Sequence, residues 1–194
     1  MKSILILSFI ILSVSSCRKD AAQELKYLNE ISAGETEGKG INYSGVINDS
    51  IFELSSIHES KFIDVNNDGE NDFEIKTFNS TSASHTTVNS TITAIGDNYF
   101  TVSELDSNSV DTLMLNNTIN NNLHWQNGIG ILYFKSDVYL QPSSQGGLWK
   151  NSINKFIGIK INVDNEILFG WIRLETTNGW NIILKDYACT AGYF

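Results

Sequence analysis

The chain has 194 residues and a formal net charge of −9 at pH 7. Hydrophobic residues make up 41% of it and aromatic residues 11%, which is enough apolar surface for a packed core and excludes wholesale disorder. A chain this acidic lacks the basic surface that nucleic-acid binding requires, so we expect no nucleic-acid partner.

The first 16 residues have the layout of a secretory signal. Lys2 precedes an apolar run from Ile4 to Leu12, and small residues lead from there to Cys17. The run is too short to cross a hydrocarbon core of roughly 30 Å, so we do not expect it to span a membrane. An ordinary cleaved signal, with Cys17 as an incidental thiol, remains the alternative.

The segment Val14-Ser15-Ser16-Cys17 resembles the lipobox of bacterial lipoproteins. That resemblance implies that residues 1–16 are removed and that Cys17 carries lipid. Two or three acyl chains would hold the protein stably on a membrane. The implied location is extracytoplasmic, on the outer membrane or cell surface of a Gram-negative bacterium.

Residues 17–40 are predicted to be a lipidated cysteine followed by a flexible tether. Ala21 to Ile31 could form a marginal helix, and Gly34 to Gly40 is an acidic, glycine-rich linker. If Cys17 carries lipid, Cys189 has no disulfide partner. Cys189 stands in an apolar, strand-like stretch, where we expect a buried structural thiol.

Residues 41–194 are predicted to form one all-β domain, a β-sandwich with a jelly roll as one arrangement. Short β-rich segments alternate here with polar turns, which is typical of sandwiches. The clearest alternation runs from Ile157 to Val163. Two polar stretches, Asn79–Asn89 and Asn116–Asn122, are expected to be loops. The predicted strands are Ile41–Val46, Ser50–Ser55, Lys61–Val65, Phe73–Phe78, Thr86–Ile95, Tyr99–Leu105, Val110–Leu115, Ile129–Phe134, Lys155–Val163, Phe169–Thr176 and Asn181–Thr190.

An acidic segment between two of these strands has the spacing of a calcium loop. A glycine, Gly69, occupies position 6, where a sharp turn is needed, and Glu70 would offer its backbone carbonyl from position 7. Ca²⁺ prefers six to eight oxygen ligands, so we expect a structural ion here. Oxygen-bearing side chains stand at positions 1, 3, 5 and 9: Asp64, Asn66, Asp68 and Asp72.

This segment resembles the calcium loops of EF-hand, dockerin-like and integrin-like proteins. Position 12 departs from that pattern, because Ile75 stands where those loops place a bidentate glutamate. Strand alternation after the loop would put Glu74 on the same side as Asp72, so Glu74 is the candidate for the missing ligand. The alternative is a plain Asn/Asp/Gly turn that needs no ion.

The segment from residue 155 to residue 190 resembles the closing three strands of a broad group of secreted or surface-anchored bacterial β-proteins. Its markers are Phe169-Gly170-Trp171-Ile172 and the later Tyr187-Ala188. The resemblance implies no shared activity. Gly158, Gly170 and Trp171 fit packing, while Trp171 and Trp180 are also candidate stacking platforms for a ligand.

No nucleophile elbow, phosphate-binding loop or paired metal-ligand motif is present, so we expect no enzyme. The leading expectation is a lipid-anchored, calcium-stabilised module with a structural or surface-interaction role. Glycan binding is the alternative, and a carbohydrate-active enzyme comes third. Exposure of at least two tryptophans on one concave face would favour glycan binding.

Overall fold

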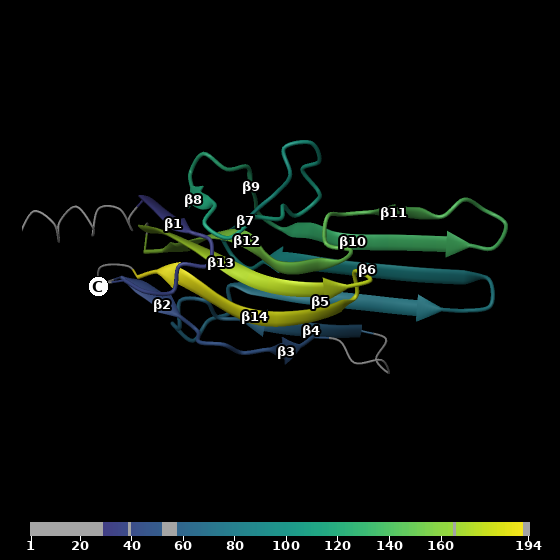
Figure 1. Cartoon of the computed structure of the whole chain (residues 1–194), viewed down its shortest axis with the longest axis horizontal. Coiled ribbons are helices and arrows are strands. Elements are labelled where there is room, and N and C mark those ends of the chain that lie inside the picture. The colour runs from purple at the N-terminus through teal and green to yellow at the C-terminus, as the bar shows by residue number, and fades with distance from the viewer. Residues whose placement is uncertain (1–28, 39, 52–57, 165, 192–194) are drawn as a thin grey trace, which may run out of the picture.

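The computed structural model describes residues 29–38, 40–51, 58–164 and 166–191. These residues form antiparallel sheets packed face to face, which confirms the all-β sandwich (Figure 1). Cys17, the signal and most of the predicted tether helix lie outside the described residues. In the part that is described, no helix is long and apolar enough to cross a membrane.

One face of the sandwich is a five-stranded sheet. Its order is β11-β10-β6-β5-β4, and every neighbouring pair is antiparallel. The strands are β4 (His58–Ile63), β5 (Phe73–Thr81), β6 (His85–Ala94), β10 (Ile129–Val138) and β11 (Ser144–Gly146).

The other face is a seven-stranded sheet in the order β2-β14-β13-β12-β7-β9, with β3 also paired to β14. The long β12-β13-β14 meander forms its centre. Its strands are β2 (Ile41–Tyr43), β3 (Asp49–Ser50), β7 (Tyr99–Thr101), β9 (Trp125–Gln126), β12 (Ser152–Val163), β13 (Glu166–Thr177) and β14 (Asn181–Thr190).

The main core lies between these two sheets. Ile75 and Ile92 face it from the five-stranded sheet, while Ile157, Ile159 and Ile161 face it from β12. This placement confirms the alternation predicted from Ile157 to Val163. It also follows from the period-2 geometry of a strand, which sends alternate side chains to one face.

A second core covers the outer face of the seven-stranded sheet. Two short strands, β1 (Glu30–Ser32) and β8 (Thr118–Asn120), pair with each other over that face. Ile31 and Ile119 are fully buried there against Trp171. Where the second core covers it, the closing meander is buried on both faces, which explains why its sequence is so apolar there.

The prediction that residues 17–40 are a tether is wrong for the last part of that range. Ile31 and Ala33 are fully buried, and Glu30–Ser32 pairs with β8. The folded part therefore begins before residue 41. Ile31, which ends the segment predicted as a marginal helix, instead lies in a strand and fills the second core.

Both predicted polar loops contain strands. The β5–β6 ladder runs as far as the Thr81–Thr86 pair, so much of Asn79–Asn89 is a hairpin. Asn116–Asn122 includes β8. Conversely, the predicted strand Val110–Leu115 makes only two isolated bridges, from Val110 and from Leu113.

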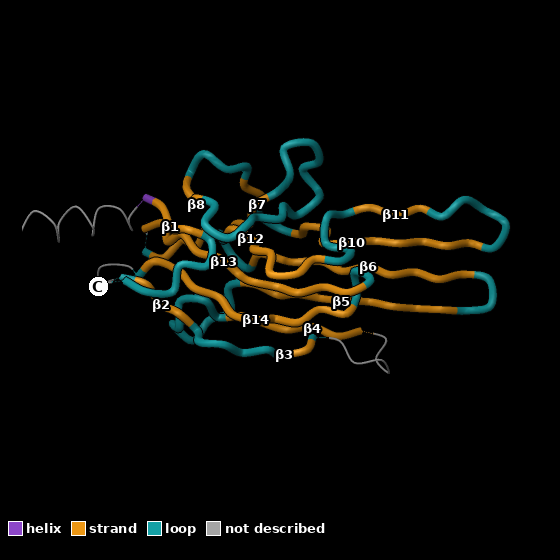
Figure 2. The backbone as a smooth tube through the Cα atoms, in the orientation of Figure 1, coloured by secondary structure: helices purple, strands orange, loops and turns teal. Residues whose placement is uncertain are grey.

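The hairpins β5–β6 and β10–β11 project beyond the seven-stranded sheet (Figures 1 and 2). We call the end of the sandwich from which they project the distal end. β1 lies at the opposite end (Figure 1). Because the second sheet stops short, the inner face of these hairpins is left partly uncovered at the distal end.

Candidate functional site

The acidic loop connects β4 to β5 and is closed by its own hydrogen bonds. The Asp64 carboxylate accepts hydrogen bonds from the backbone N–H groups of Asn67 at 2.7 Å, Asp68 at 3.3 Å and Gly69 at 2.9 Å. Asn67 and Gly69 adopt positive φ values of 63° and 92°. Asparagine and glycine tolerate this left-handed backbone best, which explains their presence in the turn.

Asp68 is held in the same loop. Its Oδ1 accepts the Glu70 N–H at 2.8 Å, and its Oδ2 accepts an Asn66 amide hydrogen at 2.8 Å. Side chains of this segment thus stabilise the turn without an ion. Each carboxylate oxygen can accept more than one bond, so these contacts leave room for further ligation.

Asp72 turns inward and is 5% exposed. Its carboxylate accepts the Val65 N–H at 2.8 Å and an Asn98 amide hydrogen at 3.0 Å. Burial raises the pKa of Asp72, and the nearby charges of Asp68 and Asp64 raise it further. The negative charges of Asp64 and Asp68 therefore repel the ionised form of Asp72, the third acid of the predicted ligand set.

The prediction that Glu74 shares a side with Asp72 is wrong. Glu74 is partly exposed on β5 and forms an ion pair with Lys76 at 3.1 Å. Strand alternation applies only from Phe73, and Asp72 precedes it in the turn. Its carboxylate caps the backbone at Val65 instead of following the outward face.

A hollow of about 160 Å³ lies beside this loop. Asp97 and Asn98, from the turn after β6, also line it. Nothing in the sequence signalled these two residues, since only the fold brings the two turns together. The other lining residues are Asn66, Asp68, Glu70, Asn71, Asp72, Ile95, Gly96, Asn162 and Val163.

The donor set of the hollow suits calcium in its chemistry, because carboxylate and amide oxygens are the ligands that Ca²⁺ prefers. Within the described ranges, however, no three His, Cys, Asp or Glu side chains converge to hold a metal ion. The calcium prediction therefore stays a prediction, based on ligand spacing and on the acidic lining.

A larger open groove of about 390 Å³ lies at the distal end, and we call it the Trp180 groove. Its floor is the uncovered inner face of the projecting hairpins. The register places Asn79, Val88 and Lys135 side by side across β5, β6 and β10. The lining residues are Asn79, Thr81, Thr86, Val88, Tyr133, Lys135, Lys150, Asn178 and Trp180.

One wall of the groove is the β13–β14 turn, which is fastened to the floor. Ser90 Oγ donates to the Gly179 carbonyl at 2.6 Å, and Thr77 Oγ1 donates to the Trp180 carbonyl at 3.2 Å. Ser90 and Thr77 are fully buried. These bonds fix the backbone that carries the half-buried Trp180 side chain relative to the strands below it.

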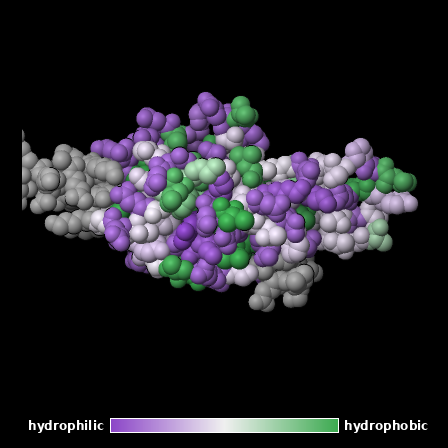
Figure 3. All heavy atoms as spheres, in the orientation of Figure 1, coloured by the Kyte–Doolittle hydropathy of each residue, from purple (hydrophilic) through white to green (hydrophobic). Residues whose placement is uncertain are grey.

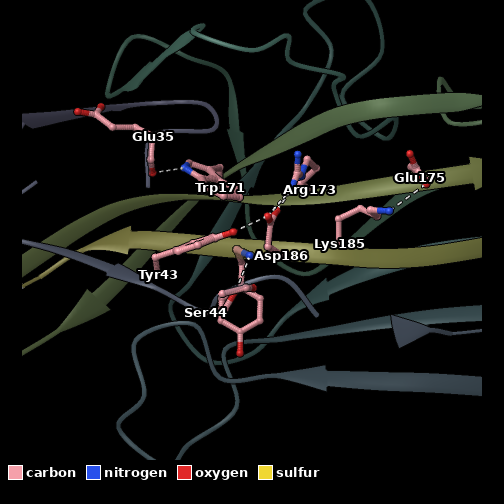
Figure 4. Close-up of polar contacts among 10 residues, drawn as sticks. Glu35, Tyr43, Ser44, Trp171, Arg173, Glu175, Lys185 and Asp186 are labelled. Atoms are coloured by element: carbon pink, nitrogen blue, oxygen red, sulfur yellow. Dashed lines mark hydrogen bonds and ion pairs between the residues drawn. The ribbon is translucent and has the colours of Figure 1, made fainter. Parts of the chain in front are cut away.

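The tryptophans do not share one exposed face. Trp149 and Trp171 are 0% and 1% exposed, and Trp125 is partly buried against the second core. Trp171 is therefore not a stacking platform. Its Nε1 donates to the Glu35 carbonyl at 3.2 Å, which ties β13 to the chain after β1 (Figure 4). Trp180 is the tryptophan that lines the groove.

A charged network lies beside Trp171 on the same face of the sheet. Asp186 is 1% exposed and lies between Arg173 and Tyr43 (Figure 4). Arg173 Nε donates to Asp186 Oδ1 at 2.8 Å, its Nη2 donates to Oδ2, and the Tyr43 hydroxyl donates to Oδ2 at 2.9 Å. All three residues lie on adjacent strands, so this network joins the sheet edge to its centre.

No family model matches the chain, and no curated protein and no solved structure matches it.

Proposed function

We propose that this protein is a lipid-anchored, non-enzymatic β-sandwich that presents its distal end to a partner at the outer surface of the cell. The observation that supports this proposal is the polarity of the fold. β1, the first described strand, lies at one end of the sandwich, and the Trp180 groove lies at the other. An anchor at Cys17 would then leave the distal end facing away from the membrane.

The distal end also carries exposed apolar side chains. Tyr139 and Leu140, at the tip of the β10–β11 hairpin, are 71% and 87% exposed. Figure 3 shows hydrophobic atoms gathered at that tip. Apolar side chains that cluster on a polar surface are typical of contact sites. The groove and the tip together make this end the best candidate for a binding surface.

The lining of the groove favours binding over hydrolysis. A glycosidase needs two carboxyl groups that flank the scissile bond. Among the described residues that line the groove, none is Asp or Glu. The proposed role is therefore capture of a partner.

A structural Ca²⁺ at the acidic loop remains part of the proposal. Asp68, Glu70, Asp72 and Asp97 line one small hollow, and an ion there would offset their mutual repulsion. The loop lies at the start of β5, whereas the groove lies at its end. The ion would stabilise the fold without touching a bound partner.

The experiment that tests this proposal combines fractionation with surface labelling. The full chain and Cys17→Ser are expressed in a Gram-negative host, and only the parent should stay with the membrane fraction. Ser84→Cys, in the distal turn between β5 and β6, should react with a membrane-impermeant maleimide in intact cells. Membrane retention of Cys17→Ser would refute the anchor, and labelling only after permeabilisation would refute surface display.

A further inference from the structure

We infer that the Trp180 groove binds a saccharide that carries a carboxylate, such as a uronic-acid oligosaccharide. The inference rests on the proposed role as a binding module and deepens it, because it names the class of ligand. It depends on three features of the groove: an aromatic wall, a set of amides and hydroxyls, and the exposed cation of Lys150.

The aromatic wall is a single tryptophan, Trp180, so the groove lacks the pair of exposed tryptophans that would by itself favour a glycan. The Trp180 side chain is half-buried, so part of the indole faces the groove, and its backbone is fixed through Thr77. A sugar ring has an apolar C–H face that packs well on a rigid aromatic ring. A turn whose backbone is held before binding loses less conformational freedom on binding, which favours affinity.

The floor supplies groups that match sugar hydroxyls. Asn79, Thr81 and Thr86 stand on paired strands, and Asn178 lies beside Trp180 on the wall. Amides and hydroxyls both donate and accept, as sugar hydroxyls do. Groups on strands are also held more precisely than groups on loops.

Asn79 carries an acceptor that no described residue satisfies. Its Oδ1 is buried and accepts no hydrogen bond from the described residues. An unsatisfied buried acceptor costs about 1–3 kcal/mol. The Asn79 side chain lines the groove, so a rotation of its amide would turn Oδ1 toward a bound hydroxyl. Ligand binding would then satisfy this acceptor.

The charge of the groove selects an acidic sugar. Its charged lining residues within the described part of the chain are Lys135 and Lys150, in a protein of net charge −9. Lys135 is already paired with Asp137. Lys150 is exposed and donates to Gln145 Oε1 at 3.3 Å. An ammonium group has three donors, so Lys150 can also bind a carboxylate.

The test uses the full-length protein in detergent micelles and follows the indole N–H signals of its four tryptophans by NMR. Probes are oligogalacturonate, oligomannuronate and sialyllactose, with the methyl ester of oligogalacturonate as the uncharged control. We expect an acidic probe to shift the Trp180 signal and to leave those of the buried Trp149 and Trp171 in place. Raising the salt concentration should weaken binding, because a charge pair contributes to it.

Variants separate the roles of the residues. Trp180→Ala and Lys150→Met should each weaken binding of the acidic probe about tenfold or more. Lys76→Met is the matched control, because Lys76 is exposed on the other face of β5, and it should leave binding unchanged. If Trp180→Ala does not fold, Trp180→Phe replaces it, and its affinity is measured by titration with the acidic probe.

Two results would overturn the inference. Absence of any shift at Trp180 with all acidic probes would remove the groove as a saccharide site. Equal affinity for oligogalacturonate and its methyl ester would remove the carboxylate assignment. Both results are independent of membrane anchoring, so they can be told apart from failure of the proposed function.

Discussion

Gly179 packs directly against the ring of Tyr133. A Cβ atom at Gly179 would stand 2.0 Å from Tyr133 Cδ1, far inside van der Waals contact. Gly179 also has a positive φ of 77°, a conformation that costs other residues energy. The turn that carries Trp180 can therefore approach the floor of the groove this closely only with glycine at this position.

Gly179→Ala should destabilise the protein and displace Trp180. The left-handed backbone costs about 1–2 kcal/mol and the forced packing about 1–3 kcal/mol more. At about 2–4 °C per kcal/mol, Tm should fall by about 4–20 °C. Gly45→Ala is the control, since Gly45 has a similar φ of 73° but nothing within 4 Å of an added Cβ. Equal losses in the two variants would contradict this account.

Removing either partner of the Arg173–Asp186 pair should have unequal effects. Arg173→Ala leaves the 1% exposed Asp186 carboxylate without its cation, whereas Asp186→Ala leaves a guanidinium whose side chain is 27% exposed. Breaking a buried pair costs about 3–5 kcal/mol, and water can offset more of that cost for Arg173. Urea denaturation should therefore show the larger loss for Arg173→Ala. Tyr43→Phe should cost about 1 kcal/mol.

Calcium should stabilise the full-length protein. Binding to the folded state alone raises stability by about 2.7 kcal/mol when the ion is present at 100 times its Kd. Thermal unfolding with millimolar calcium and with chelator measures this difference, and Asp68→Ala should abolish it. Asp106→Asn, which changes an exposed acid in another turn, should retain it. A Tm that does not depend on calcium in the parent protein would refute the structural ion.

Without calcium, Asp72 should make the fold more stable as the pH falls. Its pKa is raised above the ordinary 3.8 by burial. The folded state therefore binds this proton more tightly, and the resulting stability is lost as pH rises through the folded pKa. As the pH is lowered from 7 to 4, the parent should gain stability that Asp72→Asn cannot gain. The free energy of unfolding of Asp72→Asn should therefore fall relative to that of the parent.

Asp106 should affect the pH dependence of stability in the direction opposite to Asp72. A hydrogen bond from the Ser109 hydroxyl lowers the pKa of Asp106, so its stabilising effect is lost as pH falls. The stability of Asp106→Asn relative to the parent should therefore rise as the pH falls from about 5 to about 2, through the ordinary pKa of 3.8 and the lower folded pKa. Parallel trends in the two variants would contradict the burial of the Asp72 charge.

Cys189 should resist alkylation in the folded protein. It is fully buried, and burial raises the pKa of its thiol to about 12 from an ordinary value of 9.0. The thiolate is the reactive form, so iodoacetamide at pH 8 should modify Cys189 only after unfolding. Measurement in Cys17→Ser leaves one thiol to follow. Stability should also decrease above about pH 9, because the Cys189 thiol then ionises in the unfolded chain but stays protonated in the folded protein.

The central strands could be predicted because packing decides their sequence. The observed β14 has the predicted bounds, and Ile157, Ile159 and Ile161 face the main core as expected. Of the two interpretations of Trp171 drawn from the sequence, packing is confirmed by its burial, and the role of a stacking platform for a ligand is wrong. The second core was missed, because three-residue strands such as β1 and β8 have no periodic signal of their own.

The polar stretch Asn79–Asn89 shows why the groove was missed. Its composition is typical of a loop, yet backbone pairing holds it as a hairpin, and the Ser82 hydroxyl closes the turn by donating to the His85 carbonyl and accepting the His85 N–H. The polar residues face inward at the point where the opposite sheet has ended, so they meet solvent instead of a core. The exposure of these inward-facing residues depends on how far each of the two sheets extends. That relation cannot be predicted from the sequence of any one segment.

The burial of β1 has a mechanical consequence. If the chain is held at Cys17, any pull on a ligand in the Trp180 groove reaches the membrane through β1. Its residue pairs with β8 and the buried Ile31 would bear that load. β13 runs from the second core, where Trp171 is tied to the Glu35 carbonyl, to the turn that carries Trp180. The long central strands would therefore transmit a pulling force from the ligand to the anchored end of the domain.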